Sequence, residues 1–482
     1  MATDEEKSIV NATTTQQSDI HQHTTENGIS EKNTPVDNVN NSDDDQDAIP
    51  DPPTLRDLEH AIVDEIKNTI HHQHHPPDGG RKAWGVVFGG FLCLFCTFGF
   101  CNAIGVLQSY YETGPLRNHT ASQIGWIASA QFFFFFGAMI VGPMFDVIGA
   151  QPLLIVGTFF NVLGFMMLSI CKDDQFYGFF LCQSFVIGSA SAMIFTPAFM
   201  SVVTWFVKKR GAAAGIVASG SSIGGVIFPI MIRRLIQDVG FGWALRIAGF
   251  LILGLMSIAI FLTHSFHPPK GIKELKNKRF FDYAAFKEKK FALLTFSYFL
   301  ISFGLFVAFG YLPSYATAIG MSDDMSYYIV AIMNAASVFG RTIPPALADK
   351  YGRLNTQGLM VLLSAIIVLC VWLTGTSHAQ AIVFASLYGF STGAYVSLLA
   401  VCVAVITPDM RTIGLRSGTV QGVLSFAILG GIPGSGALIK EGVFNYGFGH
   451  CQIFSGVFLL AGGLVFVYFR HIVTDGKFFV II

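Results

Sequence analysis

Twelve long apolar segments follow Pro76, and each has enough residues to cross the hydrocarbon core of a bilayer, about 30 Å, as a helix. Lipid offers no hydrogen-bond partners, so such segments must satisfy their backbone groups within helices. The sequence therefore predicts an all-α membrane protein with twelve transmembrane helices. Their expected ranges are residues 84–110, 123–145, 151–171, 176–205, 211–236, 243–264, 291–318, 325–347, 355–375, 379–407, 412–438 and 448–470.

The composition of the 482 residues agrees with this prediction, since 52% are hydrophobic and only 13% are charged, against about 25% in an ordinary soluble protein. The chain is also rich in Phe, which suits a lipid-facing surface, and in Gly, which lets membrane helices touch. These features argue against a soluble enzyme. The basic residues punctuate long apolar runs, which indicates a lipid bilayer and not nucleic acid as the partner.

The basic residues are distributed unequally between the two sides of the predicted helices. With the N-terminus inside, 19 Lys and Arg side chains fall in inner loops and flanks and 5 in outer loops. By the positive-inside rule, both termini are predicted to be cytoplasmic. Asn118, in the sequon Asn118-His119-Thr120, then lies in the first outer loop and is a predicted glycosylation site.

Residues 1–77 form an acidic segment with 16 of the 31 acidic and 4 of the 30 basic side chains. Residues 1–50 lack aromatic residues and are predicted to be disordered. No apolar stretch near the start resembles a signal peptide, so we expect this tail to remain cytosolic. Apolar residues recur every three or four positions over 54–70, which predicts an amphipathic helix. That helix either docks on the membrane or the transporter body, or is a marginal helix in a tail. A polar histidine run follows and is more often solvated than metal-binding: His71, His72, His74 and His75.

A basic stretch, residues 265–290, divides the body into six helices before it and six after it. Asp146 and Gly149 follow the second segment, and Asp349 and Gly352 follow the eighth with the same spacing. This echo indicates an internal duplication. The expected domains are the tail 1–77, a six-helix bundle 78–264, the linker 265–290 and a second six-helix bundle 291–475.

Two six-helix halves, each with an acidic turn between its second and third helices, resemble the major facilitator superfamily of transporters. The motifs that begin the first and fifth segments, Asp78-Gly-Gly-Arg-Lys-Ala-Trp84 and Trp205-Phe-Val-Lys-Lys-Arg-Gly211, are similar to signatures of its monocarboxylate-transporter-like members. The resemblance covers about residues 76–475. Four stretches look most like the fungal branch that includes the plasma-membrane riboflavin transporter: Gly80–Trp84, Val226–Ile230, Val239–Ile247 and Phe390–Gly393.

This resemblance implies a substrate site midway through the membrane, which the two halves expose alternately to each side as they rock. It also implies a gate built on the acidic turns, whose carboxylates meet a helix N-terminus or a basic side chain in one state only. The expected gating residues are Asp146, Gly149, Asp349, Gly352, Arg353 and Arg210. For Arg210 and the two lysines before it, a plain role as positive-inside anchors is the alternative.

Arg341 lies about two turns inside the end of the eighth segment, where an ionisable group is costly to place. The resemblance implies that this arginine holds an anionic or electron-rich substrate; otherwise it pairs with the loop around Asp349. Carboxylate-carrying relatives have a lysine at the position of Asn102 and an aspartate at that of Ser337. Because both are replaced here, obligatory proton coupling is not expected, and a neutral or weakly charged solute is favoured.

Polar and aromatic side chains inside the segments are the expected substrate contacts, although such residues also serve to link helices or to line the membrane interface. A flavin ring would stack on aromatic side chains, with Phe306 and Tyr315 as further candidates, while its polar groups bond to amides. The expected binding residues are Asn102, Gln131, Gln183, Tyr311, Asn334, Arg341 and Tyr395.

These observations predict a plasma-membrane transporter that moves a small organic solute by alternating access. The leading hypothesis is facilitated uptake of riboflavin or a similar neutral solute. A proton-coupled monocarboxylate transporter is the first alternative, and a transporter-like nutrient sensor that signals through its tail is the second. No enzyme motif, cofactor site or metal site is predicted, and the chain is expected to function as a monomer.

Overall fold

The computed structural model describes residues 78–137, 139–266, 269, 271, 280–439, 444–477 and 480, which belong to one compact unit, His74–Ile482. Every secondary-structure element in these ranges is an α, 3-10 or π helix, and none of them is a strand. This is the all-helical architecture that the apolar segments predicted. The predicted disorder of residues 1–50, the predicted helix 54–70 and the histidine run 71–75 lie outside the described residues.

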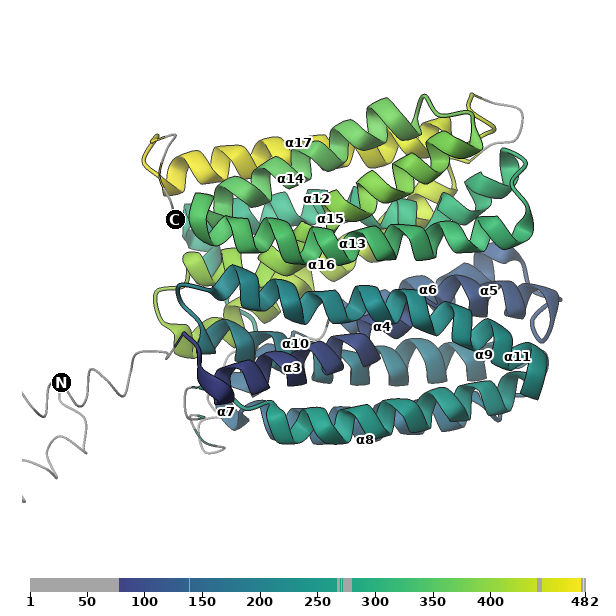
Figure 1. Ribbon diagram of the computed structural model, residues 1–482, viewed down its shortest axis with the longest axis horizontal. Helices are drawn as coiled ribbons and strands as arrows, with labels where there is room; N and C mark the ends of the chain where they lie inside the picture. The colour runs from purple at the N-terminus through teal and green to yellow at the C-terminus, as the bar shows by residue number, and fades with distance from the viewer. Residues whose placement is uncertain are drawn as a thin grey trace, which may run out of the picture. The chain divides into compact units, whose positions relative to one another are not determined.

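The helices of the first half follow the six predicted segments (Figure 1). The first segment forms α3 (Gly80–Cys96), α4 (Phe98–Cys101) and α5 (Ile104–Thr113), and the second forms α6 (Ala121–Phe136) and α7 (Val141–Ile148). The third forms α8 (Ala150–Leu168), and the fourth forms α9 (Phe176–Phe179), the π-helix η1 (Phe180–Ile187) and α10 (Gly188–Trp205). The fifth and sixth form α11 (Arg210–Leu262).

The second half begins with a 3-10 turn, η3 (Ala285–Lys287), before α12 (Lys289–Ala318) and α13 (Asp323–Tyr351). The ninth segment forms α14 (Arg353–Ile367) and a π-helical turn, η4 (Val368–Trp372), and the tenth forms α15 (His378–Val405). A second 3-10 turn, η5 (Met410–Thr412), leads into α16 (Ile413–Gly436), and α17 (Gly449–Val473) is the twelfth segment. Each predicted segment therefore coincides with helix.

Nine helices of the described residues are long and apolar enough to cross a membrane. α11 counts once among them, although Gly240, with a φ of 81°, divides it into two helical runs. α13 and α16 are not among the nine. Both lie where the two halves meet, so protein and not lipid covers much of their surface, and polar side chains are tolerated there.

The two halves are each packed internally, and two helix pairs dominate the contact between them. In the first half α11 packs against α3 and α8, and in the second α12 packs against α17 and α13 packs against α15. Between the halves α11 packs against α13 and α6 packs against α16. Figure 1 shows the first run of α11 alongside α13. In the duplicated order these are equivalent pairs, the second helix of one half with the fifth of the other.

Candidate functional site

The carboxylate of Asp349, near the end of α13, joins the two halves. Its Oδ1 accepts a hydrogen bond from the backbone N–H of Gly211 at 3.0 Å, and its Oδ2 accepts one from that of Ala212 at 2.9 Å. Both donors are in the first turn of α11, where N–H groups lack helical partners and carry partial positive charge. Arg353 pairs with the same carboxylate, with 3.2 Å between Nη2 and Oδ1. We call this set the Asp349 clasp.

Asp146, at the corresponding place in α7, makes the equivalent contact with α16. Its Oδ1 accepts from the N–H of Gly414 and its Oδ2 from that of Leu415, both at 2.9 Å. These donors are again in the first turn of a helix that belongs to the other half. We call this set the Asp146 clasp. The two clasps are the physical counterpart of the echo in the sequence.

Glycine is required at four places around the clasps. Gly149 and Gly352 have φ angles of 81° and 97°, in the left-handed region that favours glycine, and they end the turns that carry the two aspartates. At the donor helices the backbones touch. A Cβ on Gly211 would lie 2.3 Å from the carbonyl oxygen of Pro345, and one on Gly414 would lie 2.1 Å from a carbonyl oxygen of α7.

Asp78, which the sequence indicated only as the first residue of a motif, holds the loop before α11. Asp78 Oδ1 accepts hydrogen bonds from the backbone N–H groups of Val207, at 2.6 Å, and Lys208, at 2.7 Å. The motif that begins the first segment and the motif that begins the fifth therefore touch each other. Their separation of about 130 residues hid this contact from the sequence.

The two arginines predicted as gating residues brace the same region in different ways. Arg210 donates from Nε to the carbonyl oxygen of Phe206 at 2.8 Å, within its own loop. Arg353 bonds both to Asp349 and to the carbonyl oxygen of Val207. Arg353 therefore connects the two halves directly, whereas Arg210 supports the start of α11.

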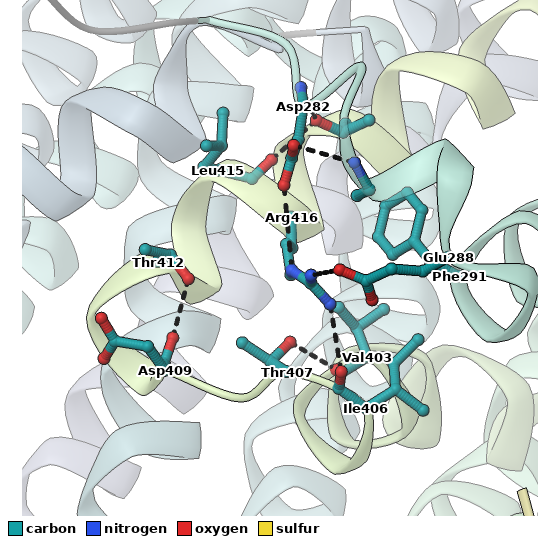
Figure 2. Close-up of polar contacts among 12 residues, drawn as sticks. Asp282, Glu288, Phe291, Val403, Ile406, Thr407, Asp409, Thr412, Leu415 and Arg416 are labelled. Atoms are coloured by element: carbon teal, nitrogen blue, oxygen red, sulfur yellow. Dashed lines mark hydrogen bonds and ion pairs between the residues drawn. The ribbon is translucent and has the colours of Figure 1, made fainter.

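Arg416 directly follows Gly414 and Leu415, the two donors of the Asp146 clasp, and Figure 2 shows its polar contacts. Its guanidinium contacts the Glu288 carboxylate, lies 3.8 Å from an oxygen of Asp282, and donates to the carbonyl oxygen of Ile406 at 3.0 Å. The Phe291 ring lies 5.5 Å away. Arg416 therefore ties the start of α16 to the chain that enters α12 and to the end of α15.

Between the clasps and the middle of the helices, α11 and α13 meet through small and polar residues. Ser222 and Ser337 share a hydrogen bond of 2.6 Å between their hydroxyl oxygens. A Cβ on Gly225 would lie 2.8 Å from Asn334 Oδ1 and 2.9 Å from Asn102 Nδ2. Two of the predicted binding amides thus converge on one glycine of α11, and the buried Asn334 Oδ1 has no hydrogen-bond partner among the described residues.

Arg341 lies in the same contact between α11 and α13, 1% exposed. Its Nη1 donates to the carbonyl oxygen of Ala218, at 3.0 Å, and to the Ser221 hydroxyl. Its guanidinium carbon lies 5.5 Å from the centre of the Phe98 ring, a cation–π distance. Arg341 therefore bonds across the halves to α11, and the pairing with Asp349 weighed from the sequence is not formed.

Gln131 and Gln183 bond to each other inside the first half. Gln183 donates to Gln131 Oε1 at 2.9 Å, and Tyr111 donates to Gln183 Oε1 at 2.6 Å. Gln131 also contacts the thiol of Cys101. The amides predicted to bind substrate thus serve here to link three helices.

A small cavity lies between the halves, and side chains from both of them line it. It is lined mainly by aromatic and aliphatic side chains, with Ser302, Tyr395 and Gln421 as its polar groups. The other lining residues are Phe136, Phe195 and Phe199 from the first half and Phe306, Val396, Leu399, Ala400, Leu424 and Ile428 from the second.

Of the predicted binding residues, the cavity includes only Tyr395, with the stacking candidate Phe306 beside it. Tyr311 bonds instead to the carbonyl oxygen of Ile432 at 3.0 Å. The ring of Phe98 separates Arg341 from the cavity. The centroids of the Phe98 ring and of the Phe136 ring, which lines the cavity, are 6.0 Å apart. The predicted residues therefore occupy several places, and most of the cavity wall was not predicted.

Asn118, the predicted glycosylation site, is exposed in the loop between α5 and α6. Its neighbour His119 lies 3.4 Å from a carboxylate oxygen of Asp174. Within the described ranges, no group of three or more His, Cys, Asp or Glu side chains is placed to hold a metal ion.

Comparisons with known proteins agree with this architecture. The model of the Major Facilitator Superfamily matches residues 86–414. The chain is 41% identical to the aspyridones efflux protein apdF of Emericella nidulans, over 81% of this chain and 78% of that protein. It is also 41% identical to the fujikurins efflux protein of Gibberella fujikuroi, over 84% of this chain and 86% of that protein.

A solved structure gives the same fold. The human organic anion transporter MFSD10 (TETRAN) superposes with a TM-score of 0.63 at 15% sequence identity, over 81% of this chain and 100% of the other. At this identity the likeness concerns the fold alone.

Proposed function

This chain belongs to the major facilitator superfamily, and we propose that it exports an apolar organic metabolite from the cytosol by alternating access. It is a multi-pass membrane transporter and not an enzyme. The observation that carries the proposal is the cavity, because side chains of both halves line it. A compound bound there would be exposed to one side or the other as the halves rock.

The clasps supply the gate of this cycle. Both lie at the ends of helices that enter inner loops in the orientation given by the positive-inside rule, so their closure would seal the cytoplasmic side. In the structure both clasps are formed, and the bound compound would leave on the other side. Release of the clasps would then reopen the cavity to the cytosol for the next molecule.

Arg341 has a part in the same cycle. Its guanidinium donates hydrogen bonds to Ala218 and Ser221 of the opposite half. These bonds must break when the halves separate near α11. The buried cation would then need a new partner. We propose that an electron-rich group of the passing compound, or water, replaces those partners in the open state.

The cavity favours this substrate class over the earlier hypotheses. A monocarboxylate such as lactate would find no basic side chain in the lining of the cavity, and Asn102 and Ser337 stand where the expected relay has a lysine and an aspartate. Riboflavin would find rings to stack on, but its ribityl hydroxyls would meet few polar groups. Export is proposed because the two relatives described above are efflux proteins by name.

We further propose the plasma membrane as the location, with both termini cytoplasmic, a glycan on Asn118 and a monomer as the working unit. The basis is the charge distribution together with the exposed sequon. A nutrient-sensing role remains the alternative. It predicts that deletion of residues 1–77 abolishes a cellular response while transport is unchanged.

The test is transport into inverted plasma-membrane vesicles, whose cytoplasmic face is outside. The substrates are purified aspyridones, riboflavin and lactate, each with and without an imposed proton gradient. Saturable accumulation of aspyridones supports export. Transport of lactate driven by protons, or of riboflavin alone, would contradict it.

A matched pair of variants shows whether the cavity is the route. Ala400→Trp places a large ring in the cavity from α15, and Val383→Trp places the same ring on the exposed side of the same helix. We expect the first to abolish transport and the second to preserve it. Equal activity in both variants would argue against transport through this cavity.

A further inference from the structure

A hydrogen bond joins the two halves at the wall of the cavity. The Thr196 hydroxyl, on α10, donates to Gln421 Oε1, on α16, at 3.0 Å. Both side chains are almost fully buried, at 1% and 4% exposed. In this bond the carbonyl oxygen of the Gln421 amide faces Thr196.

The other end of that amide is available to a ligand. A side-chain amide has a carbonyl acceptor and an NH₂ group with two donors. Thr196 occupies the acceptor, and in the described part of the chain the Gln421 Nε2 forms no hydrogen bond. Because Gln421 lines the cavity, this wall offers N–H donors to a compound inside.

A second donor comes from a pair of hydroxyls on the same half. Ser302 and Tyr395 share one hydrogen bond of 2.9 Å between their oxygens, and both line the cavity. Whichever hydroxyl donates within the pair, the hydrogen of the other remains for a third group. The second half therefore presents two donor positions.

The facing wall and the charge of the cavity restrict the ligand further. Phe136, Phe195 and Phe199 of the first half are apolar rings, which suit the face of a flat conjugated body. The residues that line the cavity include no Asp, Glu, Lys, Arg or His, so a charged ligand would lose its hydration without an opposite charge.

We infer that Gln421 is a specificity-determining residue that binds a carbonyl oxygen of an uncharged, flat, conjugated substrate. The Ser302–Tyr395 pair supplies the second donor, and the rings of the first half cover the body of the compound. This inference rests on the proposed export function and names its substrate class.

The test is equilibrium binding of two tritium-labelled probes to the purified full-length protein in nanodiscs. Fluorenone and fluorene have the same flat skeleton, and only fluorenone has a carbonyl oxygen. One added neutral hydrogen bond predicts that fluorenone binds roughly fivefold to tenfold more tightly. Gln421→Met keeps the bulk of the side chain without its donors, and we expect the two affinities to become equal.

Thr196→Val removes the bond that orients the Gln421 amide and leaves its NH₂ group intact. We expect it to weaken the preference for fluorenone without abolishing it. Tyr395→Phe tests the second donor in a different helix, and we expect it to reduce the preference by a smaller factor. Thermal unfolding of each variant shows that it is folded.

Equal affinities for the wild-type protein, or no binding of either probe, would overturn the inference. A preference that survives Gln421→Met in a folded variant would also overturn it. Failure of the export function is a different result, since it appears as absent transport in vesicles while the binding preference persists.

Discussion

The two clasps share one geometry and differ in the arginine that supports each. In both, an aspartate binds two consecutive backbone N–H groups at the start of a helix in the other half. At the Asp349 clasp Arg353, four residues after the aspartate, pairs with the carboxylate itself. The position four residues after Asp146 is Ala150, and the arginine there is Arg416, on the donor helix.

The duplication therefore preserved the contact between aspartate and helix N-terminus but not the arginine that supports it. Arg353 reinforces the clasp locally, because it touches the carboxylate and the loop before the donor helix. Arg416 links its clasp to Glu288 and Asp282, in the chain that connects the halves. A change in that connecting chain should therefore alter the stability of the Asp146 clasp and leave that of the Asp349 clasp unchanged.

The largest expected effect comes from the glycines that let the helices touch, and it should be the same at both clasps. Gly211→Ala and Gly414→Ala each place a Cβ within 2.3 Å of a backbone oxygen of the other half. We expect each change to disfavour the closed state by about 3 kcal/mol, roughly a hundredfold in its population. Distances between spin labels at positions 208 and 350, and at 151 and 411, measure the two clasps separately.

The matched control for these variants is Gly254→Ala, in the second run of α11, where a Cβ meets nothing within 4 Å. It should leave both label distances at their wild-type values. If Gly211→Ala behaved in the same way as this control, close approach of the backbones would not be what holds the Asp349 clasp.

Removal of the aspartate charges should separate the clasps. Asp349→Asn loses both the charged acceptor and the partner of Arg353. We expect it to destabilise the closed state relative to the open state by about 2 to 3 kcal/mol. Asp146→Asn likewise loses the charged acceptor of two backbone N–H groups, and we expect a cost of at least about 1.5 kcal/mol. The same two label pairs report each effect. Wild-type label distances in either variant would contradict a role of that carboxylate in closure.

Arg353→Ala should weaken only the Asp349 clasp, by about 1 kcal/mol, because the pair keeps some contact with solvent and is partly screened by it. A double-mutant cycle with Asp349→Asn isolates the interaction. We expect the arginine to matter little once the carboxylate is gone. Full additivity of the two changes would mean that Arg353 acts through Val207 and not through the aspartate.

The sequence predicted the helices and the clasps because their signals are local. The twelve apolar runs match the thickness of a bilayer, and at both clasps the glycine three residues after the aspartate ends the helix. Asn102, Asn334 and Arg341 also stand out in the sequence as polar residues inside apolar segments, and the structure brings them together around α11.

The cavity was not predictable in the same way, since in a membrane both lipid and cavity favour apolar side chains. The run of phenylalanines over 132–136 shows the problem. Phe136 lines the cavity, while Phe133 packs against Phe426, a residue 58% exposed on the outer surface. Neighbouring identical residues therefore face different environments, and only the packing of the other half distinguishes them.

The smallest expected effect tests the link between the connecting chain and one clasp. Glu288 bonds to Arg416 and has a side chain 45% exposed, so Glu288→Gln should cost about 0.5 kcal/mol. The loss should appear only in the label pair 151 and 411 and should shrink in high salt, because screening weakens exposed pairs. Glu112→Gln, which removes the charge from a carboxylate that accepts a hydrogen bond from Gln108 on α5, is the control. An equal change at both clasps would show that the connecting chain acts on the halves as a whole and not through Arg416.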